Sequence, residues 1–219
     1  KLWSVDSPNL YWVRTEIIQN GKVVDRTDSR FGIRYIATNP NSGFYLNGVH
    51  TKLNGVCEHS DLGSLGMETY QAAVDRRIRT LKKYGVNAIR TSHNPVSPEF
   101  IEACDRLGML VFEEAFDQWL YSKNSDDYHN YFNKAADGKT VVFDKAGNDN
   151  TNNDTSYIEV KREDLQSNAE RDIKAMVDRD KNAPCIFAWS TGNEIYDARY
   201  KHGENTLDML TGWGRKKLR

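Results

Sequence analysis

The chain has 219 residues, and its 30 lysines and arginines against 31 aspartates and glutamates leave a formal net charge of −1. This balance excludes a nucleic-acid binder that relies on bulk positive charge, and it disfavours non-specific binding to anionic membranes. No apolar run approaches the roughly 18 residues that a membrane span needs, so we expect a soluble protein. The first residues lack the shape of a signal peptide, and the compartment stays open.

The first 40 residues have the pattern of β-structure. Residues 10–18 are rich in aromatic and β-branched side chains, and Asn20-Gly21 supplies a two-residue hairpin turn before a strand at 22–25. A third apolar run predicts a strand at 31–36. Three strands cannot cover both of their faces, so they need further strands or a neighbouring domain.

Beyond residue 40 the hydrophobic pattern changes, and predicted strands alternate with predicted helices. A second hairpin is predicted around Asn47-Gly48, with strands at 44–46 and 50–53. Beyond it we predict strands at 53–57, 86–90, 109–113 and 185–189, and helices at 68–84, from Pro98 to a stop at Gly108, at 160–180 and from Glu204 onward. Such an alternation implies parallel strands in an α/β sheet or barrel, and the nearly continuous apolar strands are expected to be buried on both faces.

Neither a disulfide framework nor a metal site is expected. An odd number of cysteines without paired spacing predicts buried free thiols at Cys57, Cys104 and Cys185. His59, His93 and Glu114 lack the close spacing of zinc ligands. The Asp/Asn/Gly-rich segment at 137–154 does not match a calcium loop, so a solvated loop is the better interpretation. We expect no cofactor.

Polar and ionisable residues cluster at the end of each predicted parallel strand. The clusters are Glu58, His59 and Asp61; Arg90, Ser92, His93 and Asn94; Glu113, Glu114 and Asp117; and Ser190, Thr191, Asn193 and Glu194. Loop polarity explains one such cluster, but four in register favour a site, because the carboxyl ends of barrel strands meet at the rim that holds active sites. With Trp119 and Trp189, these groups suit a neutral ligand rich in hydroxyls. A nucleotide is disfavoured because no glycine-rich loop precedes a helix.

Asn193-Glu194 is the sharpest pattern. A Glu at the mouth of a barrel strand can donate a proton to a leaving glycosidic oxygen, and the Asn before it can bind a ring hydroxyl beside the anomeric carbon. The dipeptide alone is weak. Its place after an apolar strand that Pro184 opens makes glycoside hydrolysis the favoured chemistry.

At these residues the chain resembles glycoside hydrolase family 2, the family of β-galactosidases, β-glucuronidases and β-mannosidases. Residues 2–11 and 31–34 look like the closing strands of that family's immunoglobulin-like sandwich. The family's first four barrel strands are matched in order by residues 44–56, 87–95, 112–117 and 188–194. The resemblance therefore implies an α/β fold: sandwich strands at 1–40, followed at 41–219 by strands one to four of a TIM barrel. Since a complete barrel takes about 250 residues, we expect a fragment of a longer enzyme.

The resemblance also implies a retaining mechanism and a set of site residues. Glu194 is expected to be the general acid and base, and Asn193 to bind the sugar 2-hydroxyl. The remaining sugar contacts are expected to come from Arg90, His93, Asp61, Glu114 and Trp119. The nucleophile, a second Glu from the seventh strand, is expected to lie outside this sequence. Residues 117–120 lack the further Glu and His of metal-binding β-galactosidases, so no catalytic magnesium is expected.

Several alternatives stay open. A β-linked saccharide is the expected substrate, and a β-galactoside is preferred only because that activity is the commonest in the family; β-glucuronidase or β-mannosidase specificity is the runner-up. A different class is a catalytically silent fragment that binds carbohydrate or self-associates into a homo-oligomer through exposed sheet edges. A metal-dependent hydrolase on an α/β barrel would need His and Asp spacing that the sequence does not contain.

Overall fold

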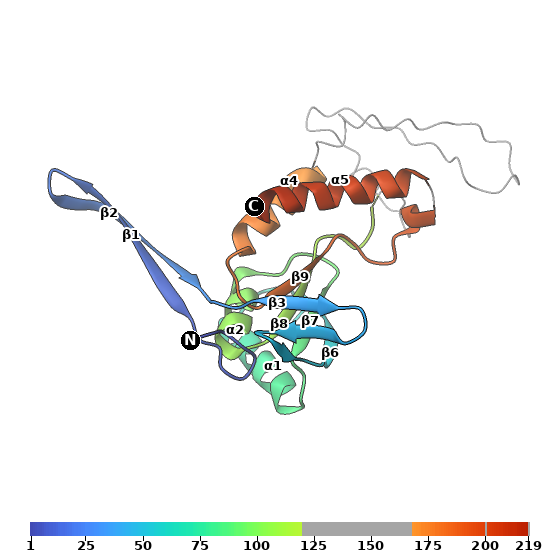
Figure 1. Cartoon of the computed structure of the whole chain (residues 1–219), viewed down its shortest axis with the longest axis horizontal. Coiled ribbons are helices and arrows are strands. Elements are labelled where there is room, and N and C mark those ends of the chain that lie inside the picture. Colours follow the sequence, from blue (N-terminus) through green and yellow to red (C-terminus); the bar gives the residue numbers. More distant parts are fainter. Residues whose placement is uncertain (120–167, 200, 219) are drawn as a thin grey trace, which may run out of the picture. The chain divides into compact units, whose positions relative to one another are not determined.

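The computed structural model describes residues 1–119, 168–199 and 201–218, and the chain divides into two compact units. The first comprises Lys1–Glu113 with Asp180–Trp189, and the second comprises Glu114–Arg179 with Ser190–Arg219. Figure 1 shows the elements along the chain. Within the described residues, no helix is both long enough and apolar enough to cross a membrane.

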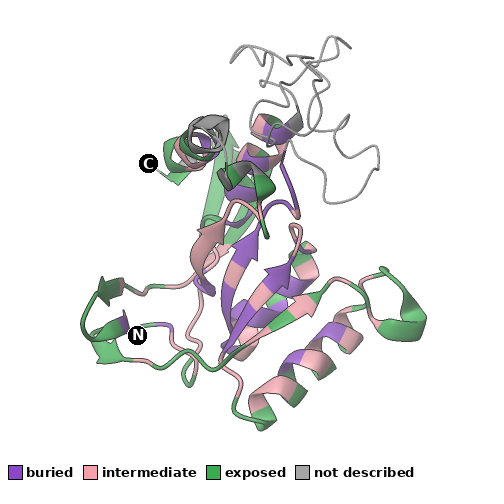
Figure 2. Cartoon of the chain, turned by 90° about the vertical axis from the view of Figure 1, so that its right-hand side faces the viewer, coloured by how far each residue is buried: buried purple, intermediate pink, exposed green. Residues whose placement is uncertain are grey.

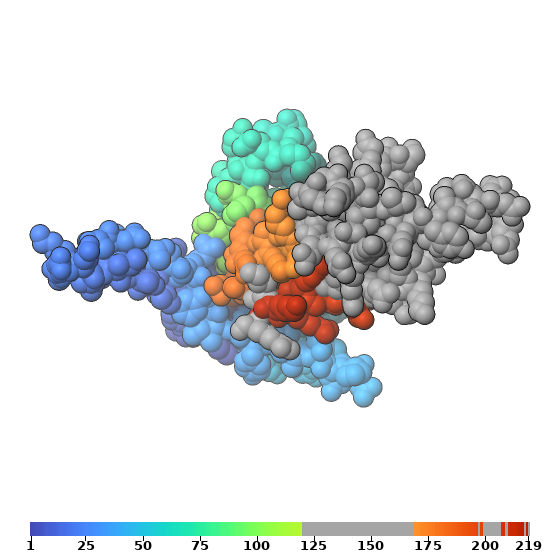
Figure 3. Space-filling model, turned by 90° about the horizontal axis from the view of Figure 1, so that it is seen from above, coloured from blue at the N-terminus to red at the C-terminus, as the bar shows by residue number. Residues whose placement is uncertain are grey.

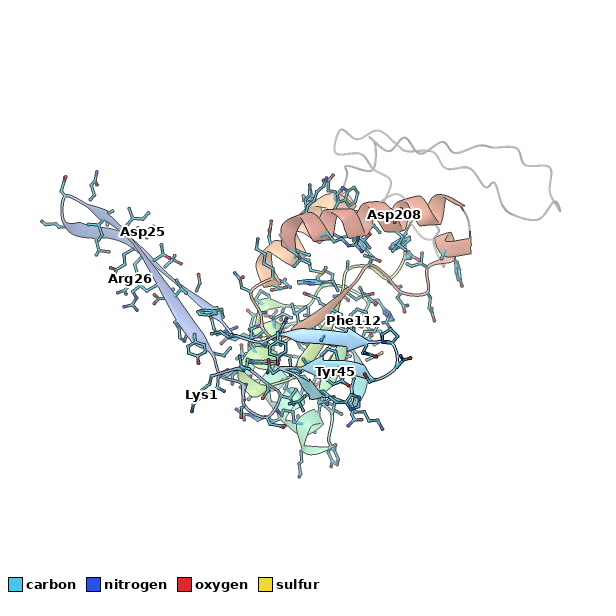
Figure 4. All side chains as sticks on the ribbon, viewed as in Figure 1. Lys1, Asp25, Arg26, Tyr45, Phe112 and Asp208 are labelled. Atoms are coloured by element: carbon cyan, nitrogen blue, oxygen red, sulfur yellow. The ribbon has the colours of Figure 1, made fainter. Side chains whose placement is uncertain are left out.

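The first unit begins with a two-stranded antiparallel ribbon of β1 (Tyr11–Gln19) and β2 (Lys22–Phe31). The predicted turn is confirmed, because Asn20 and Gly21 have φ values of 50° and 75° and so adopt the left-handed conformation that a tight hairpin needs. Most of the ribbon is exposed, and it extends away from the rest of this unit in both the ribbon and space-filling views (Figures 1 and 3). Asp25 and Arg26 lie towards its outer end (Figure 4).

The strand predicted at 31–36 is wrong. Phe31 ends β2, Ile36 begins β3 (Ile36–Asn39), and the residues between them are not strand. Residues 32–35 make contacts with a distant part of the chain in place of strand-to-strand hydrogen bonds. A Cβ on Gly32 would lie only 2.5 Å from the Pro184 ring, and the Arg34 guanidinium donates to the carbonyl oxygens of Pro184, at 2.9 Å, and Ile186.

A small antiparallel sheet follows, in the order β3-β4-β5. Strand β4 (Gly43–Leu46) and strand β5 (Val49–His50) form the hairpin predicted around Asn47-Gly48, although β5 is shorter than expected. Pairing of β3 with β4 adds a strand that the sequence pattern did not predict.

The four predicted α/β strands form one sheet in the order β6-β7-β8-β9, which confirms the α/β fold class. These strands are β6 (Gly55–His59), β7 (Ala88–Ser92), β8 (Leu110–Glu114) and β9 (Ile186–Ser190), and β6 to β8 are parallel. Each begins one or two residues later than predicted. The predicted first residues of two strands instead cap helices, because the Val86 amide donates to Leu81 O at 3.1 Å and the Met109 amide to Cys104 O at 2.9 Å.

Two helices connect the first three of these strands. Helix α1 (Gln71–Lys83) buries Val74 and Ile78, as its period predicts. Helix α2 (Pro98–Leu107) begins and ends as predicted: the Ser97 hydroxyl accepts from the Phe100 amide at 3.3 Å, and Gly108 has a φ of 74°.

Burial of the sheet is less uniform than predicted. In β7 and β8 four of five residues are buried, whereas β6 is alternately exposed because it lies at the edge of this sheet (Figure 2). The Cys57 thiol on β6 is therefore exposed, which corrects the prediction of a buried thiol. Cys104 and Cys185 are free and fully buried as predicted, and burial raises the pKa of both thiols.

The second unit contains α4 (Asn168–Asp180) and α5 (Lys201–Leu218), with a short 3-10 turn η2 (Tyr196–Arg199) before α5. The apolar residues of α4 are buried at Ala169, Ile173, Met176 and Val177. The start predicted for this helix at residue 160 and the loop predicted at 137–154 lie outside the described residues.

Candidate active site

The predicted site residues lie in or follow the strands of the four-stranded sheet, and they belong to both compact units. Asp61, Arg90 and His93 belong to the first unit. Glu114, Trp119, Asn193 and Glu194 belong to the second.

In the first unit, His59 ends β6 and is the parallel-strand neighbour of Ser92, which ends β7. The rings of His59 and His93 are edge-to-face, with centroids 5.4 Å apart. Two residue pairs earlier in the same ladder, a guanidinium nitrogen of Arg90 lies 3.9 Å from the Cys57 sulfur. Neighbouring strands therefore bring the two imidazole rings together and place the Arg90 guanidinium beside a thiol.

Asp61 shapes the loop after β6. Its carboxylate accepts from the Gly63 amide at 3.0 Å, and its carbonyl oxygen accepts from the Arg77 guanidinium at 2.5 Å. Arg77 also forms an ion pair with Glu58 at 3.1 Å. The Asp61 side chain is exposed but already caps a local turn, so its contact with a sugar stays a prediction.

In the second unit, the end of β8 is tied to the end of β9. The Ala115 amide donates to Ser190 O at 2.9 Å, and the Ser190 hydroxyl donates to Glu114 Oε2 at 2.6 Å. Glu114 is fully buried. A buried carboxylate needs such partners, because leaving it without them would carry a large desolvation cost.

Trp119 is held against the turn that follows β9. Its indole N–H donates to Thr191 O at 2.7 Å, and its side chain is 3% exposed. Gly192 fits beside it only because it has no side chain: a Cβ there would lie 2.8 Å from Trp119 Nε1 and 2.5 Å from Ile195 Cδ1. Trp119 therefore packs against this turn, and its predicted contact with a sugar is not tested.

Asn193 and Glu194 follow directly. The Asn193 amide nitrogen donates to Asp117 Oδ1 at 3.0 Å, and Asn193 is 8% exposed. Glu194 is exposed, and its φ of 45° places it in the left-handed region. Non-glycine residues rarely adopt this conformation, and where they do it often belongs to a functional site.

The sequence pattern identified residues 114–119 and 190–194 as polar clusters but not the pairing between them. Asp117 and Ser190 belong to those clusters but were not among the expected sugar contacts, and each hydrogen-bonds a residue of the candidate site. No signal in one sequence pairs residues more than 70 positions apart. Within the described residues, no group of three or more His, Cys, Asp or Glu side chains is arranged to hold a metal ion.

Comparison with known proteins covers nearly the whole chain. Residues 38–215 match the description "Glycosyl hydrolases family 2, TIM barrel domain", and residues 1–34 match "Glycosyl hydrolases family 2". The beta-galactosidase BoGH2A of Bacteroides ovatus is 37% identical over 209 residues, which are 95% of this chain and 21% of that protein. A putative beta-glucuronidase of Formosa agariphila is also 37% identical, over 90% of this chain and 16% of that protein.

The fold agrees with these matches. A glycosyl hydrolase family 2 member from Bacteroides cellulosilyticus, known from a crystal structure, is 38% identical in sequence and superposes with a TM-score of 0.80. The superposition covers 99% of this chain and 24% of the Bacteroides cellulosilyticus chain. This chain therefore spans about a fifth of the length of the curated relatives, 21% for the Bacteroides ovatus protein. The chain belongs to glycosyl hydrolases family 2, and its parallel sheet is part of the family's TIM barrel.

Proposed function

We propose that this chain carries the acid/base side of the active site of a retaining β-glycosidase. The observation that carries the proposal is Glu194, an exposed carboxylate in a left-handed backbone conformation, next to an Asn193 that is anchored by its side chain. Glu194 donates a proton to the glycosidic oxygen as the bond breaks, and later removes a proton from the water that releases the sugar. Asn193 binds the 2-hydroxyl.

The retaining reaction needs a second carboxylate about 5–5.5 Å from the acid/base. We propose that this nucleophile, a Glu of the seventh barrel strand, lies outside these 219 residues. The remaining sugar contacts are assigned to Arg90, His93, Asp61, Glu114 and Trp119. Residues 1–40 are proposed to be the closing strands of an immunoglobulin-like sandwich, and residues 41–219 the first half of the barrel.

A β-galactoside is the preferred substrate and a β-glucuronide the alternative. Each substrate is supported by one relative: a protein named as a beta-galactosidase and a protein named as a putative beta-glucuronidase are both 37% identical to this chain. Initial rates with nitrophenyl β-galactoside and nitrophenyl β-glucuronide, measured on the enzyme that carries this chain, decide between them.

The role of Glu194 is tested by leaving-group dependence. With the Glu194→Gln variant, hydrolysis of a nitrophenyl glycoside should fall by about 10²–10⁴-fold, the usual contribution of general acid catalysis. A dinitrophenyl glycoside, whose leaving group needs no proton, should lose much less in the glycosylation step. The matched control is Glu16→Gln on the exposed β1 strand, which should keep wild-type rates. Equal losses for both leaving groups would contradict the acid role.

The location of the nucleophile is tested with the 219-residue chain by itself. We expect no turnover of any nitrophenyl β-glycoside. Turnover that Glu194→Gln abolishes would overturn the proposal that the second carboxylate lies elsewhere.

A further inference from the structure

Three contacts join residues 114–119 to residues 190–193 in the second unit. The Ser190 hydroxyl donates to Glu114, the Trp119 indole donates to the Thr191 carbonyl, and the Asn193 amide donates to Asp117. The Ser190 contact holds the residue at which the turn begins, and the Thr191 contact holds the backbone of the turn. The third holds the side chain of Asn193 itself, so it can control what that amide presents to a ligand.

The chemistry of Asp117 determines which end of the amide faces it. An ionised carboxylate has no hydrogen to donate and only accepts. The Asn193 group that lies 3.0 Å from Asp117 Oδ1 must therefore be the NH₂, and the amide oxygen is directed to the other side of the amide. A hydrogen bond to a charged acceptor is stronger than one between neutral groups, and Asn193 is 92% buried, so water competes weakly for it.

We propose that Asp117 is a positioning residue that fixes the orientation of the Asn193 amide for its hydrogen bond with the sugar hydroxyl next to the anomeric carbon. The inference rests on the proposed function. It assigns to Asp117 a role in rate without any contact with the substrate.

The variant that tests the inference is Asp117→Asn, which keeps the size of the side chain. An amide at 117 can either donate or accept, so it no longer dictates the orientation of Asn193. Hydrogen bonds to the 2-hydroxyl strengthen in the transition state of glycoside hydrolysis. We therefore expect kcat/KM for a nitrophenyl β-glycoside to fall roughly ten- to hundred-fold, mainly through kcat.

The deciding comparison uses two substrates, the nitrophenyl β-glycoside and its 2-deoxy counterpart, on the enzyme that carries this chain. If Asp117 acts through the 2-hydroxyl contact, Asp117→Asn should change the 2-deoxy rate by less than about twofold. The ratio of the two kcat/KM values does not depend on how much of a variant is folded, so a partly misfolded variant still gives an answer. Asp117→Glu, which restores an acceptor-only carboxylate, should move the ratio back towards the wild-type value. Asp25→Asn on the exposed ribbon is the matched control.

A double-mutant cycle completes the test. In an Asn193→Ala background, Asp117→Asn should have no further effect on the ratio, because the group that it orients is gone. Equal losses on both substrates, or a loss that persists in the Asn193→Ala background, would overturn the inference and leave the proposed function intact. A wild-type enzyme that hydrolyses no nitrophenyl β-galactoside, β-glucuronide or β-mannoside would overturn the proposed function, and this inference with it.

Discussion

The backbone of Glu194 predicts an unusual order of stability among variants. Its φ is 45°, a conformation that costs an L-residue with a Cβ about 1–2 kcal/mol. Glycine does not have this cost, but it loses about 0.5–1 kcal/mol through the greater freedom of its unfolded chain. The difference predicts that Glu194→Gly is more stable than Glu194→Ala by about 0.5–1 kcal/mol.

The assay is urea unfolding of the 219-residue chain, followed by circular dichroism. Thr191 is the matched control position, since it lies in the same turn and is not among the residues with positive φ. At Thr191 the order should reverse, with Thr191→Ala more stable than Thr191→Gly by about 0.5–1 kcal/mol. Both substitutions at either position remove the side chain beyond Cβ, so only the backbone conformation distinguishes the two sites.

The same order at both positions, with alanine more stable than glycine, would refute the reasoning. It would mean that Glu194 does not keep a left-handed backbone in solution. The predicted order would instead identify a residue at which stability is given up for the placement of the proposed acid/base carboxylate.

Two further predictions concern stability in the first unit. Gly85 and Gly108 both follow a helix with left-handed φ values of 84° and 74°, but a Cβ at Gly85 meets open space, whereas one at Gly108 would lie 2.2 Å from the Val5 carbonyl oxygen. Urea unfolding should show that Gly85→Ala costs about 1–2 kcal/mol and Gly108→Ala about 1–3 kcal/mol more; equal costs would contradict the packing of Val5 there. Arg106 donates to Asp75 at 2.6 Å, and this hydrogen bond lowers the pKa of the Asp75 carboxyl. A carboxyl group whose pKa is lowered in the folded state contributes stability above its usual pKa near 4, and this contribution is lost as the pH falls through the folded-state pKa. Arg106→Gln should therefore cost about 0.5–1 kcal/mol in urea unfolding at pH 7, and progressively less as the pH falls below about 4.

Local rules predicted the helices well because the signals that they use are local. The Ser97 cap, Pro98 and Gly108 lie within one turn of the helix ends that they define. Strand starts were less predictable. Val86 and Met109 look like strand residues by composition, but their amides close the C-terminal ends of helices, and only the three-dimensional path of the chain decides between the two uses.

Contacts between distant segments could not be predicted in the same way. The pattern at residues 31–36 is typical of a strand, but its place is determined by Pro184 and by carbonyl groups about 150 positions away, which Arg34 reaches. The exposure of Cys57 likewise depends on the place of β6 at the edge of the sheet. In the site, Asn193-Glu194 was recognisable from the sequence, whereas the Asp117 contact was not.

The segment before the barrel contributes directly to the core of the first unit. Trp3 is fully buried, and its indole N–H donates to the Asp105 carbonyl at 2.8 Å. The Asp105 carboxylate accepts from the Cys185 amide at 3.0 Å and from Arg30 at 3.3 Å. Burial raises the pKa of this carboxyl, and the two hydrogen bonds reduce that rise without cancelling it. One residue of α2 thus holds the N-terminal segment, the end of β2 and the residue that leads into β9. Since β9 continues into Asn193 and Glu194, the residues that precede the barrel help to determine where the strand of the proposed acid/base begins.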